Sequence, residues 1–254
     1  MDIEIRADYG GRARTLVFNR PTKKNALTVA MYAALADELT RAASSPEVLA
    51  VVITGAGDAF TAGNDIQDFI AQPPVSDDSH VVRFLTALAT FPKPILAAVN
   101  GVAIGVGTTM LLHCDLVIAT SNARFQLPFV KLGLCPEGGS SLLLPRMVGL
   151  QRASEVLLWG EPFDAETARH LGFVNDVVDA SALAANVAAR VEKLLELPPD
   201  AVAAAKRLIR EPLRAELATT MAREAELFRE RLASSEAAEA FAAFVEKRKP
   251  RFSR

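Results

Sequence analysis

The chain has 254 residues, of which 50% are hydrophobic and 23% are charged, which fits one globular core with a small appendage. Lys and Arg number 28 against 30 Asp and Glu, so there is no basic excess to attract nucleic acid or an anionic membrane surface. Cys114 and Cys135 are the two cysteines, too few to suggest a disulfide framework. We therefore expect a cytoplasmic protein that binds neither nucleic acid nor membrane.

Strand and helix patterns alternate over the first 140 residues or so. Residues 3–19 predict two strands joined through Tyr9-Gly10-Gly11, and residues 27–44 an amphipathic helix with Thr28 as its N-cap. A buried strand over 48–55 and a loop over 56–69 follow. The next predictions are a helix over 80–91, a strand over 93–100, a helix over 103–114, and strands over 115–120 and 123–127. This order indicates an α/β fold with largely parallel sheets.

Residues 94–114 lack Asp, Glu, Lys and Arg over a length that could cross a bilayer. Asn100-Gly101 is a turn signal inside this stretch, and Asp115 leads directly into another apolar run. We interpret the stretch as a buried strand, a turn and a buried helix.

Helical patterns dominate after about residue 140, over 154–160, 164–172, 182–197, 199–210 and from Leu213 onward. Leu197-Pro198-Pro199 is the expected joint, which divides the chain into an α/β core over 1–197 and a helical region over 198–254. The last helices carry apolar residues that must pack either on the body of the same chain or on another subunit: Leu227, Phe228, Leu232, Phe241, Phe244 and Val245.

Common nucleotide and metal motifs are incomplete. Gly55 and Gly57 fit the first two glycines of a dinucleotide fingerprint, but Phe60 stands where the third is needed. No glycine loop is followed by a Walker lysine, and the run GGSS lacks the spacing of a nucleophile elbow. The three histidines are far apart, and none forms an i, i+4 pair with another ligand: His80, His113 and His170. We predict no metal site.

Two loops and one carboxylate remain as candidates for chemistry. The loops over 60–69 and 100–107 follow buried strands, where each can present a free backbone N–H, and two convergent N–H groups make an oxyanion hole. Glu137 lies between Pro136 and a glycine pair in the segment CPEGGSS. From these residues alone it is either a solvated turn residue or the base of an active site.

Several motifs in a fixed order resemble the crotonase, or enoyl-CoA hydratase/isomerase, superfamily over essentially the whole chain. They are FTAGNDIQDF, PKPILAAVNGVAIGVG, CDLVIAT, ARFQLPFVKLGLCPEGGSS, LPRMVG and the terminal FVEKRKPRF. The resemblance implies a spiral of ββα repeats, a C-terminal helical trimerisation region and a homotrimer or hexamer. It also implies an acyl-CoA thioester as substrate, with coenzyme A as part of that substrate and no separate cofactor.

The resemblance assigns the backbone N–H groups of Asn64 and Val106 to the thioester oxygen, although Val106 replaces the glycine usual in hydratases. Five positions match the loops that contact coenzyme A, with the first as a phosphate neighbour: Lys23, Ala26, Ala62, Asp65 and Ile66. Lys247 or Lys249 could approach coenzyme A from the C-terminal segment.

The acids distinguish the branches of the superfamily. Hydratases use two glutamates, and the matching positions here are Thr109 and Phe129, neither of which can act as a general base. Between residues 101 and 141 the acids are Asp115, which begins a strand and is expected to be structural, and Glu137. The P-E-G motif resembles the peroxisomal-type Δ3,Δ2-enoyl-CoA isomerases, which implies that Glu137 is the catalytic base.

The chemistry agrees with one carboxylate. Conversion of a 3-enoyl-CoA to the 2-trans-enoyl-CoA removes a proton from C2 and returns one to C4, so one glutamate can serve both steps. A hydratase or another crotonase-type lyase would need a second acid, such as Asp68 or one in the segment around Asp77 and Asp78. A non-catalytic CoA-ester-binding or RNA-binding relative is the third alternative, and the balanced charge disfavours RNA.

Overall fold

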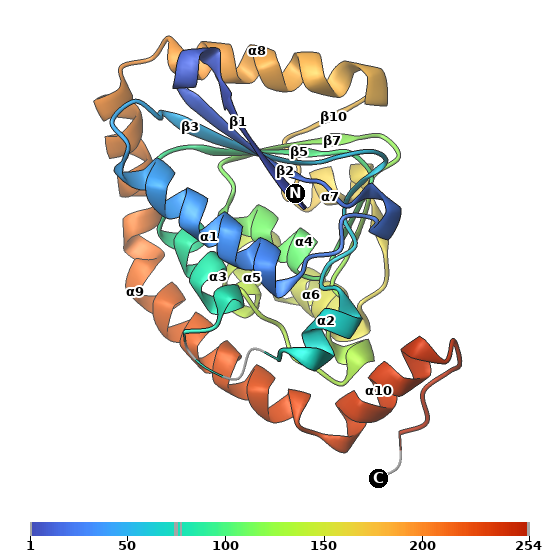
Figure 1. The fold of residues 1–254 in the computed structure, drawn as a ribbon. Coiled ribbons are helices and arrows are strands. Elements are labelled where there is room, and N and C mark those ends of the chain that lie inside the picture. Colours follow the sequence, from blue (N-terminus) through green and yellow to red (C-terminus); the bar gives the residue numbers. More distant parts are fainter. Residues whose placement is uncertain (1, 74–75, 77, 253–254) are drawn as a thin grey trace.

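The computed structural model describes residues 2–73, 76 and 78–252, which build two sheets surrounded by helices (Figure 1). The larger sheet has the order β1 (Ile3–Asp8), β2 (Ala13–Phe18), β3 (Ala50–Gly55), β5 (Ile95–Val99), β7 (Leu116–Thr120) and β10 (Asp176–Val178). The smaller sheet has the order β4 (Ala59–Thr61), β6 (Val102–Ile104), β8 (Arg124–Gln126) and β9 (Phe163–Asp164). The pairs β1–β2 and β8–β9 are antiparallel and the other pairs are parallel.

A repeating unit of two strands and a helical segment builds the body. β3, β5 and β7 lie in the larger sheet, and each is followed directly by a strand of the smaller sheet: β4, β6 and β8. A helical segment comes next each time, starting with α2 (Ile66–Ala71) and α3 (His80–Thr90), then α4 (Val106–Thr109) and the 3-10 turn η3 (Met110–His113), then the 3-10 turn η4 (Val130–Leu132) and α5 (Ser140–Val148). The expected ββα spiral is therefore confirmed.

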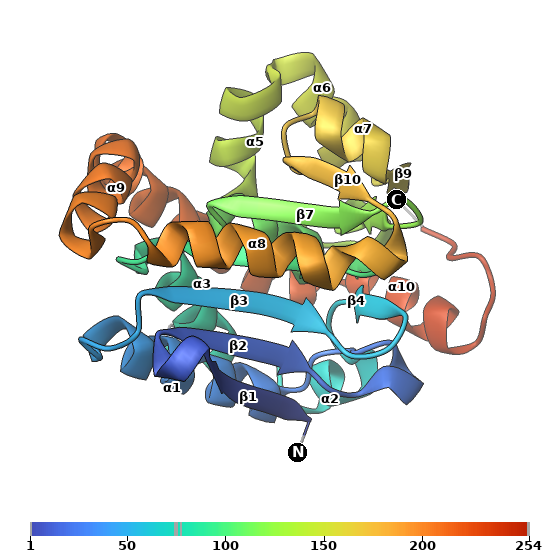
Figure 2. The same cartoon turned by 90° about the horizontal axis from the view of Figure 1, so that it is seen from above.

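The larger sheet is covered on both faces. Helix α8 (Leu183–Leu195) packs on one face through Leu183, Val187 and Val191 (Figure 2). The other face carries the main core, to which α1 (Val29–Ser44) and α3 contribute. Every residue of β5 is buried, which explains its continuous apolar run, as in other parallel strands.

The sequence predictions missed some short elements. The expected loop over 56–69 contains β4 and the start of α2, and the expected helix over 103–114 is instead β6, α4 and η3. Beyond residue 140, β9 and β10 add two short strands among α5, α6 (Leu150–Ser154), the π-helical turn η5 (Glu155–Trp159), α7 (Ala165–His170) and the 3-10 turn η6 (Ala180–Ala182). The missed strands β4, β6, β9 and β10 have two or three residues each, too few for a clear periodicity.

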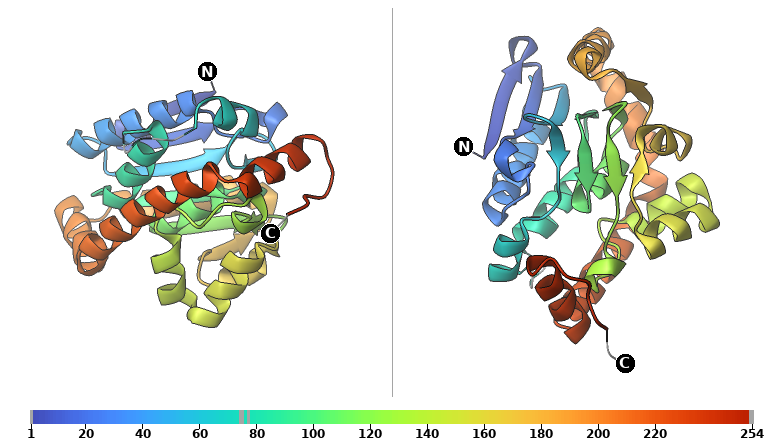
Figure 3. Two further views of the ribbon diagram at one scale, coloured as in Figure 1. Left: turned by 90° about the horizontal axis from the view of Figure 1, so that it is seen from below. Right: turned by 90° about the vertical axis from the view of Figure 1, so that its right-hand side faces the viewer.

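Helix α9 (Pro199–Leu232) runs across the body and leads into α10 (Ser235–Val245) (Figure 3). It is one helix of 34 residues with Pro212 inside it, where the sequence predicted two segments. Lys206 Nζ donates to Asp115 Oδ2 at 2.6 Å, and Arg210 donates to the Cys114 carbonyl at 2.9 Å and to Asp115 Oδ1 at 3.1 Å. Asp115 thus ties α9 to the end of η3, in the structural role expected of it.

Some apolar residues of the last helices pack on the body of the same chain, and others are exposed. Phe228 and Phe241 are buried on the body, where each ring lies against Phe69, at 6.3 and 6.5 Å between centroids. Leu232 packs against the same core, whereas Leu227, Phe244 and Val245 are exposed. In the described part of the chain, no helix has the length and apolar character needed to span a membrane.

Candidate active site

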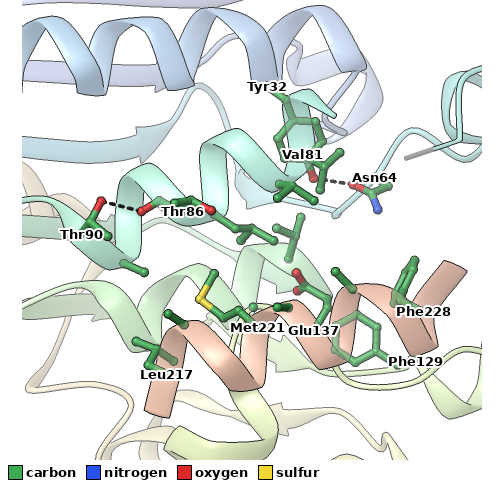
Figure 4. Close-up of a pocket in the computed structure, with 18 of the residues that line it drawn as sticks. Tyr32, Asn64, Val81, Thr86, Thr90, Phe129, Glu137, Leu217, Met221 and Phe228 are labelled. Carbon is green, nitrogen blue, oxygen red and sulfur yellow. Dashed lines mark hydrogen bonds between the residues drawn. The ribbon is translucent and has the colours of Figure 1, made fainter. Parts of the chain in front are cut away.

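A cavity of about 320 Å³ lies between α3 and α9 (Figure 4). Helix α3 contributes Val81, Val82, Leu85, Thr86, Ala89 and Thr90, and α9 contributes Arg214, Leu217, Ala218, Met221, Ala222, Ala225 and Phe228. Its remaining lining residues are Tyr32, Asn64, Phe69, Val106, Phe129, Glu137 and Gly138. The structure therefore brings the three predicted catalytic residues, Asn64, Val106 and Glu137, to one mostly apolar cavity.

Two glycines bring the predicted oxyanion loops together. Gly63 has a φ of +88°, and a Cβ at this position would lie 2.7 Å from the Ile104 carbonyl oxygen. A Cβ at Gly107 would lie 2.6 Å from Thr61 Cγ2, so the loops that carry Asn64 and Val106 approach more closely than larger residues allow.

The geometry leaves both predicted N–H donors available. In the parallel bridge between Leu27 and Asn64, the donors are the N–H groups of Leu27 and Asp65. The N–H of Asn64 therefore points away from the Leu27 segment. Val106 is the first residue of α4, where the N–H has no partner within the helix. In the described part of the chain neither N–H has an acceptor.

Glu137 is partly buried in the wall of the cavity, and its pKa is strongly raised. The pKa of Glu137 is raised from 4.5 to about 7, mainly by burial. The hydrogen bond from the Thr109 hydroxyl lowers this pKa, and the negative charge of Glu224 raises it further. Thr109 Oγ1 donates to Glu137 Oε1. Thr109, which the sequence resemblance matches to one hydratase glutamate, thus contacts the carboxylate of Glu137, and Phe129, which it matches to the other, lines the cavity.

Side chains from other elements complete the surroundings of Glu137. The Tyr32 hydroxyl donates to Asn64 Oδ1, and burial, followed by the charge of Glu137, raises the pKa of Tyr32 well above its ordinary value. His113 Nε2 lies 2.7 Å from the Gly138 carbonyl, and burial lowers the pKa of His113 to about 4. A neutral His113 therefore donates to the residue after Glu137. Sequence reasoning missed Tyr32, because nothing in its local pattern separates it from a core tyrosine.

The five predicted coenzyme A positions lie on two adjacent segments of the chain, one of which ends in the first residue of α2. Ala62 N–H donates to the Lys24 carbonyl at 2.9 Å, and Asp65 N–H donates to the Leu27 carbonyl at 2.9 Å. These bonds join the segment that contains Lys23 and Ala26 to the segment that contains Ala62, Asp65 and Ile66. The Lys23 side chain is exposed, and Asp65 forms an ion pair with Arg20 at 3.1 Å. Lys247 and Lys249 are exposed beyond α10 and do not line the cavity.

Among the described residues, the acids that the sequence offered as a second catalytic group of a hydratase lie outside the cavity. Asp68 accepts the Val29 N–H at 2.7 Å, where it caps α1, and Asp78 is exposed, so neither lines the cavity. Asp77 falls outside the described residues. Within residues 2–73, 76 and 78–252, no cluster of three or more His, Cys, Asp or Glu side chains could hold a metal ion.

A second cavity, of about 330 Å³, adjoins the first and shares four of its lining residues: Ala89, Thr90, Arg214 and Leu217. It extends along the same two helices towards the N-terminal part of α9.

The fold and the site define an α/β protein of the crotonase class. A solved enoyl-CoA hydratase/isomerase from Pseudoalteromonas atlantica T6c is 45% identical and covers 100% of both chains, with a TM-score of 0.94. The enoyl-CoA hydratase/isomerase family model matches residues 14–254, and the chain belongs to this family.

Individual relatives differ in their reactions. Enoyl-CoA delta isomerase 2 of Rattus norvegicus is 36% identical over 95% of this chain, and the chain spans 63% of that relative's length. The 2,3-dehydroadipyl-CoA hydratase of Escherichia coli K12 is also 36% identical, over 95% of each chain. At equal identity to an isomerase and a hydratase, the choice between the two reactions depends on the residues of the site.

Proposed function

We propose that this protein converts 3-enoyl-CoA thioesters to 2-trans-enoyl-CoA thioesters with Glu137 as a single proton shuttle. One observation carries the proposal: Glu137 is partly buried and lines the same cavity as Asn64 and Val106, while Thr109 and Phe129 stand at the positions that the sequence resemblance matches to the hydratase glutamates. The other acids weighed for a hydratase, Asp68 and Asp78, do not line this cavity. Addition of water needs a group to activate the water and another to protonate carbon, and one carboxylate does not supply both at once.

The thioester oxygen accepts hydrogen bonds from the N–H groups of Asn64 and Val106, which makes the C2 protons acidic. Ionised Glu137 removes a proton from C2, and the electron pair passes to the thioester oxygen as a dienolate. The same N–H groups stabilise this oxyanion, each by about 3 kcal/mol. Protonated Glu137 then donates to C4 as the electron pair returns, so the double bond moves to C2–C3 and the carboxylate is regenerated.

Two features of the cavity support this shuttle. A carboxyl group with a pKa of about 7 both accepts and donates protons readily near neutral pH. The apolar walls formed by α3 and α9 suit a hydrocarbon chain and limit the access of water to the dienolate.

Coenzyme A binds, in this proposal, along the two joined segments that carry Lys23, Ala26, Ala62, Asp65 and Ile66, with Lys23 near a phosphate. No metal or separate cofactor takes part. We further propose a cytoplasmic homotrimer, or a hexamer of two trimers, because Leu208 and Ile209 of α9 are 73% and 72% exposed and would be covered by another subunit.

A product assay tests the reaction. The purified protein is incubated separately with a 3-enoyl-CoA and a 2-trans-enoyl-CoA, and the products are separated by chromatography. We expect a shift of the double bond with the first substrate and little 3-hydroxyacyl-CoA with the second. Efficient hydration without a double-bond shift would establish the hydratase alternative, and binding of both thioesters without turnover would establish a non-catalytic relative.

A further inference from the structure

Helix α5, which follows Glu137 after two glycines, has no cap of its own. Its N-cap residue is Gly139, which has no side chain to accept the free N–H groups of the first turn. Ser140 N–H and Ser140 Oγ both donate to the Glu137 carbonyl, at 3.1 and 2.6 Å. The backbone of Glu137 is therefore fixed to the first residue of α5, and any group that holds this helix end also holds Glu137.

Glu224 of α9 supplies the missing cap from more than 80 positions away. Its Oε2 accepts the Gly139 N–H at 2.6 Å, and its Oε1 accepts the Ser141 N–H at 3.0 Å and the Ser141 hydroxyl at 2.5 Å. Three donors on two oxygens match an ionised carboxylate, which only accepts hydrogen bonds. Glu224 is 7% exposed, and this network together with the helix dipole offsets the cost of burying its charge.

We propose that Glu224 is a positioning residue for Glu137: it ties the segment that carries this acid to α9 and places a fixed negative charge beside it. The inference rests on the proposed role of Glu137. Because α9 also lines the cavity through Leu217, Met221 and Phe228, the same contact sets Glu137 at a fixed place relative to the acyl-binding wall.

The negative charge matters because most titratable neighbours of Glu137 are uncharged near neutral pH. Burial lowers the pKa of His113 to about 4 and raises the pKa of Cys135 to about 11. Tyr32 also stays protonated, because its pKa is well above the ordinary value. Arg214 lines the cavity as a cation, but its side chain is exposed, so solvent screens it. The buried carboxylate of Glu224 is the charged neighbour that raises the pKa of Glu137.

Substitutions at position 224 separate the effect of the negative charge from the effect of the side-chain length that the hydrogen bonds require. Glu224→Gln removes the charge with little change in shape, and Glu224→Asp keeps the charge but is too short to hold both Gly139 and Ser141. Glu226→Gln, at an exposed position two residues further along α9, is the matched control. The titration of Glu137 is followed by NMR of ¹³C-carboxyl-labelled glutamate, with Glu137→Gln used to assign its signal.

For Glu224→Gln we expect a midpoint of the Glu137 titration lower by about half a pH unit or more, and a kcat about tenfold lower with a KM close to wild type. Glu224→Asp should lower kcat but leave the midpoint near the wild-type value, and Glu226→Gln should change neither. An unchanged Glu137 midpoint in Glu224→Gln, with kcat and thermal stability falling in parallel, would reduce Glu224 to a structural cap and overturn the inference.

Two further measurements distinguish a failure of the proposed function from a failure of the inference about Glu224. The titration needs no substrate, so a protein without isomerase activity in which Glu224→Gln still moves the midpoint would reject the proposed function and retain the charge effect. If Glu224→Gln does not fold, Ser141→Ala removes one donor to the same carboxylate. It should lower kcat several-fold at unchanged KM, and wild-type kinetics in this variant would contradict the positioning role.

Discussion

Replacement of Glu137 by glutamine should stabilise the protein while it removes activity. The substitution keeps the shape of the side chain and can still accept the hydroxyl hydrogen bond from Thr109. It removes the one charge that must be buried in an apolar cavity when the acid ionises. Because the pKa of Glu137 is raised by burial, the folded state holds its proton more tightly than the unfolded chain does.

The size and sign of the effect follow from this pKa. Below pH 4.5 the acid is protonated in both states, and its ionisation has no effect on stability. As pH rises from 4.5 to about 7 the unfolded chain loses the proton first, so the wild-type protein loses stability. The interval corresponds to about 3 kcal/mol at about 1.4 kcal/mol for each pH unit, and the loss is complete above pH 7.

Urea denaturation between pH 5 and pH 8.5, at one protein concentration because assembly affects apparent stability, measures this difference. The free energy of unfolding of the variant should exceed that of the wild type by an amount that grows with pH, up to about 3 kcal/mol at pH 8. The isomerase kcat of the variant should be about 10²–10⁴-fold lower than that of the wild type. A stability difference that stays constant over this pH range would show that Glu137 titrates normally, and unchanged turnover would show that it is not the base.

Three further outcomes are expected. Thr109→Val removes the hydroxyl that lowers the pKa of Glu137, so the rising limb of the pH–kcat/KM profile should move to higher pH; an unmoved limb would contradict the assigned contact. Ala89→Phe, between the two cavities, should lower kcat/KM about tenfold for acyl chains long enough to reach the second cavity and spare short ones. Ala215→Phe on α9, which lines neither cavity, is its control, and equal effects on all chain lengths would exclude this path. Gly63→Ala should lower the free energy of unfolding in urea by about 2 kcal/mol or more, because residue 63 has a positive φ and its new Cβ would lie 2.7 Å from the Ile104 carbonyl oxygen. An unchanged free energy of unfolding would refute the close packing of the oxyanion loops.

The sequence by itself determined the α/β class and the identity of the candidate base. Continuous apolar runs such as the one that forms β5 indicate strands covered on both faces, and Thr28 identifies the start of α1, where it accepts the Met31 N–H. The acids of the central segment are few, and the resemblance to the crotonase superfamily, which matches Thr109 and Phe129 to the two hydratase glutamates, indicated Glu137 as the base. Short strands such as β4 and β10 were beyond prediction because three residues have no periodicity to detect.

Only the tertiary structure decided what surrounds Glu137. Tyr32 and Glu224 are far from position 137 in the sequence, and on their own helices they look like a core tyrosine and one of many surface glutamates. Burial and hydrogen bonding depend on which helix faces pack together, and α9, which lines the cavity, is attached to Asp115 through Lys206 and Arg210. The sequence therefore predicts which acid is available, whereas its proton affinity results from neighbours that only the packing of α1, α5 and α9 brings together.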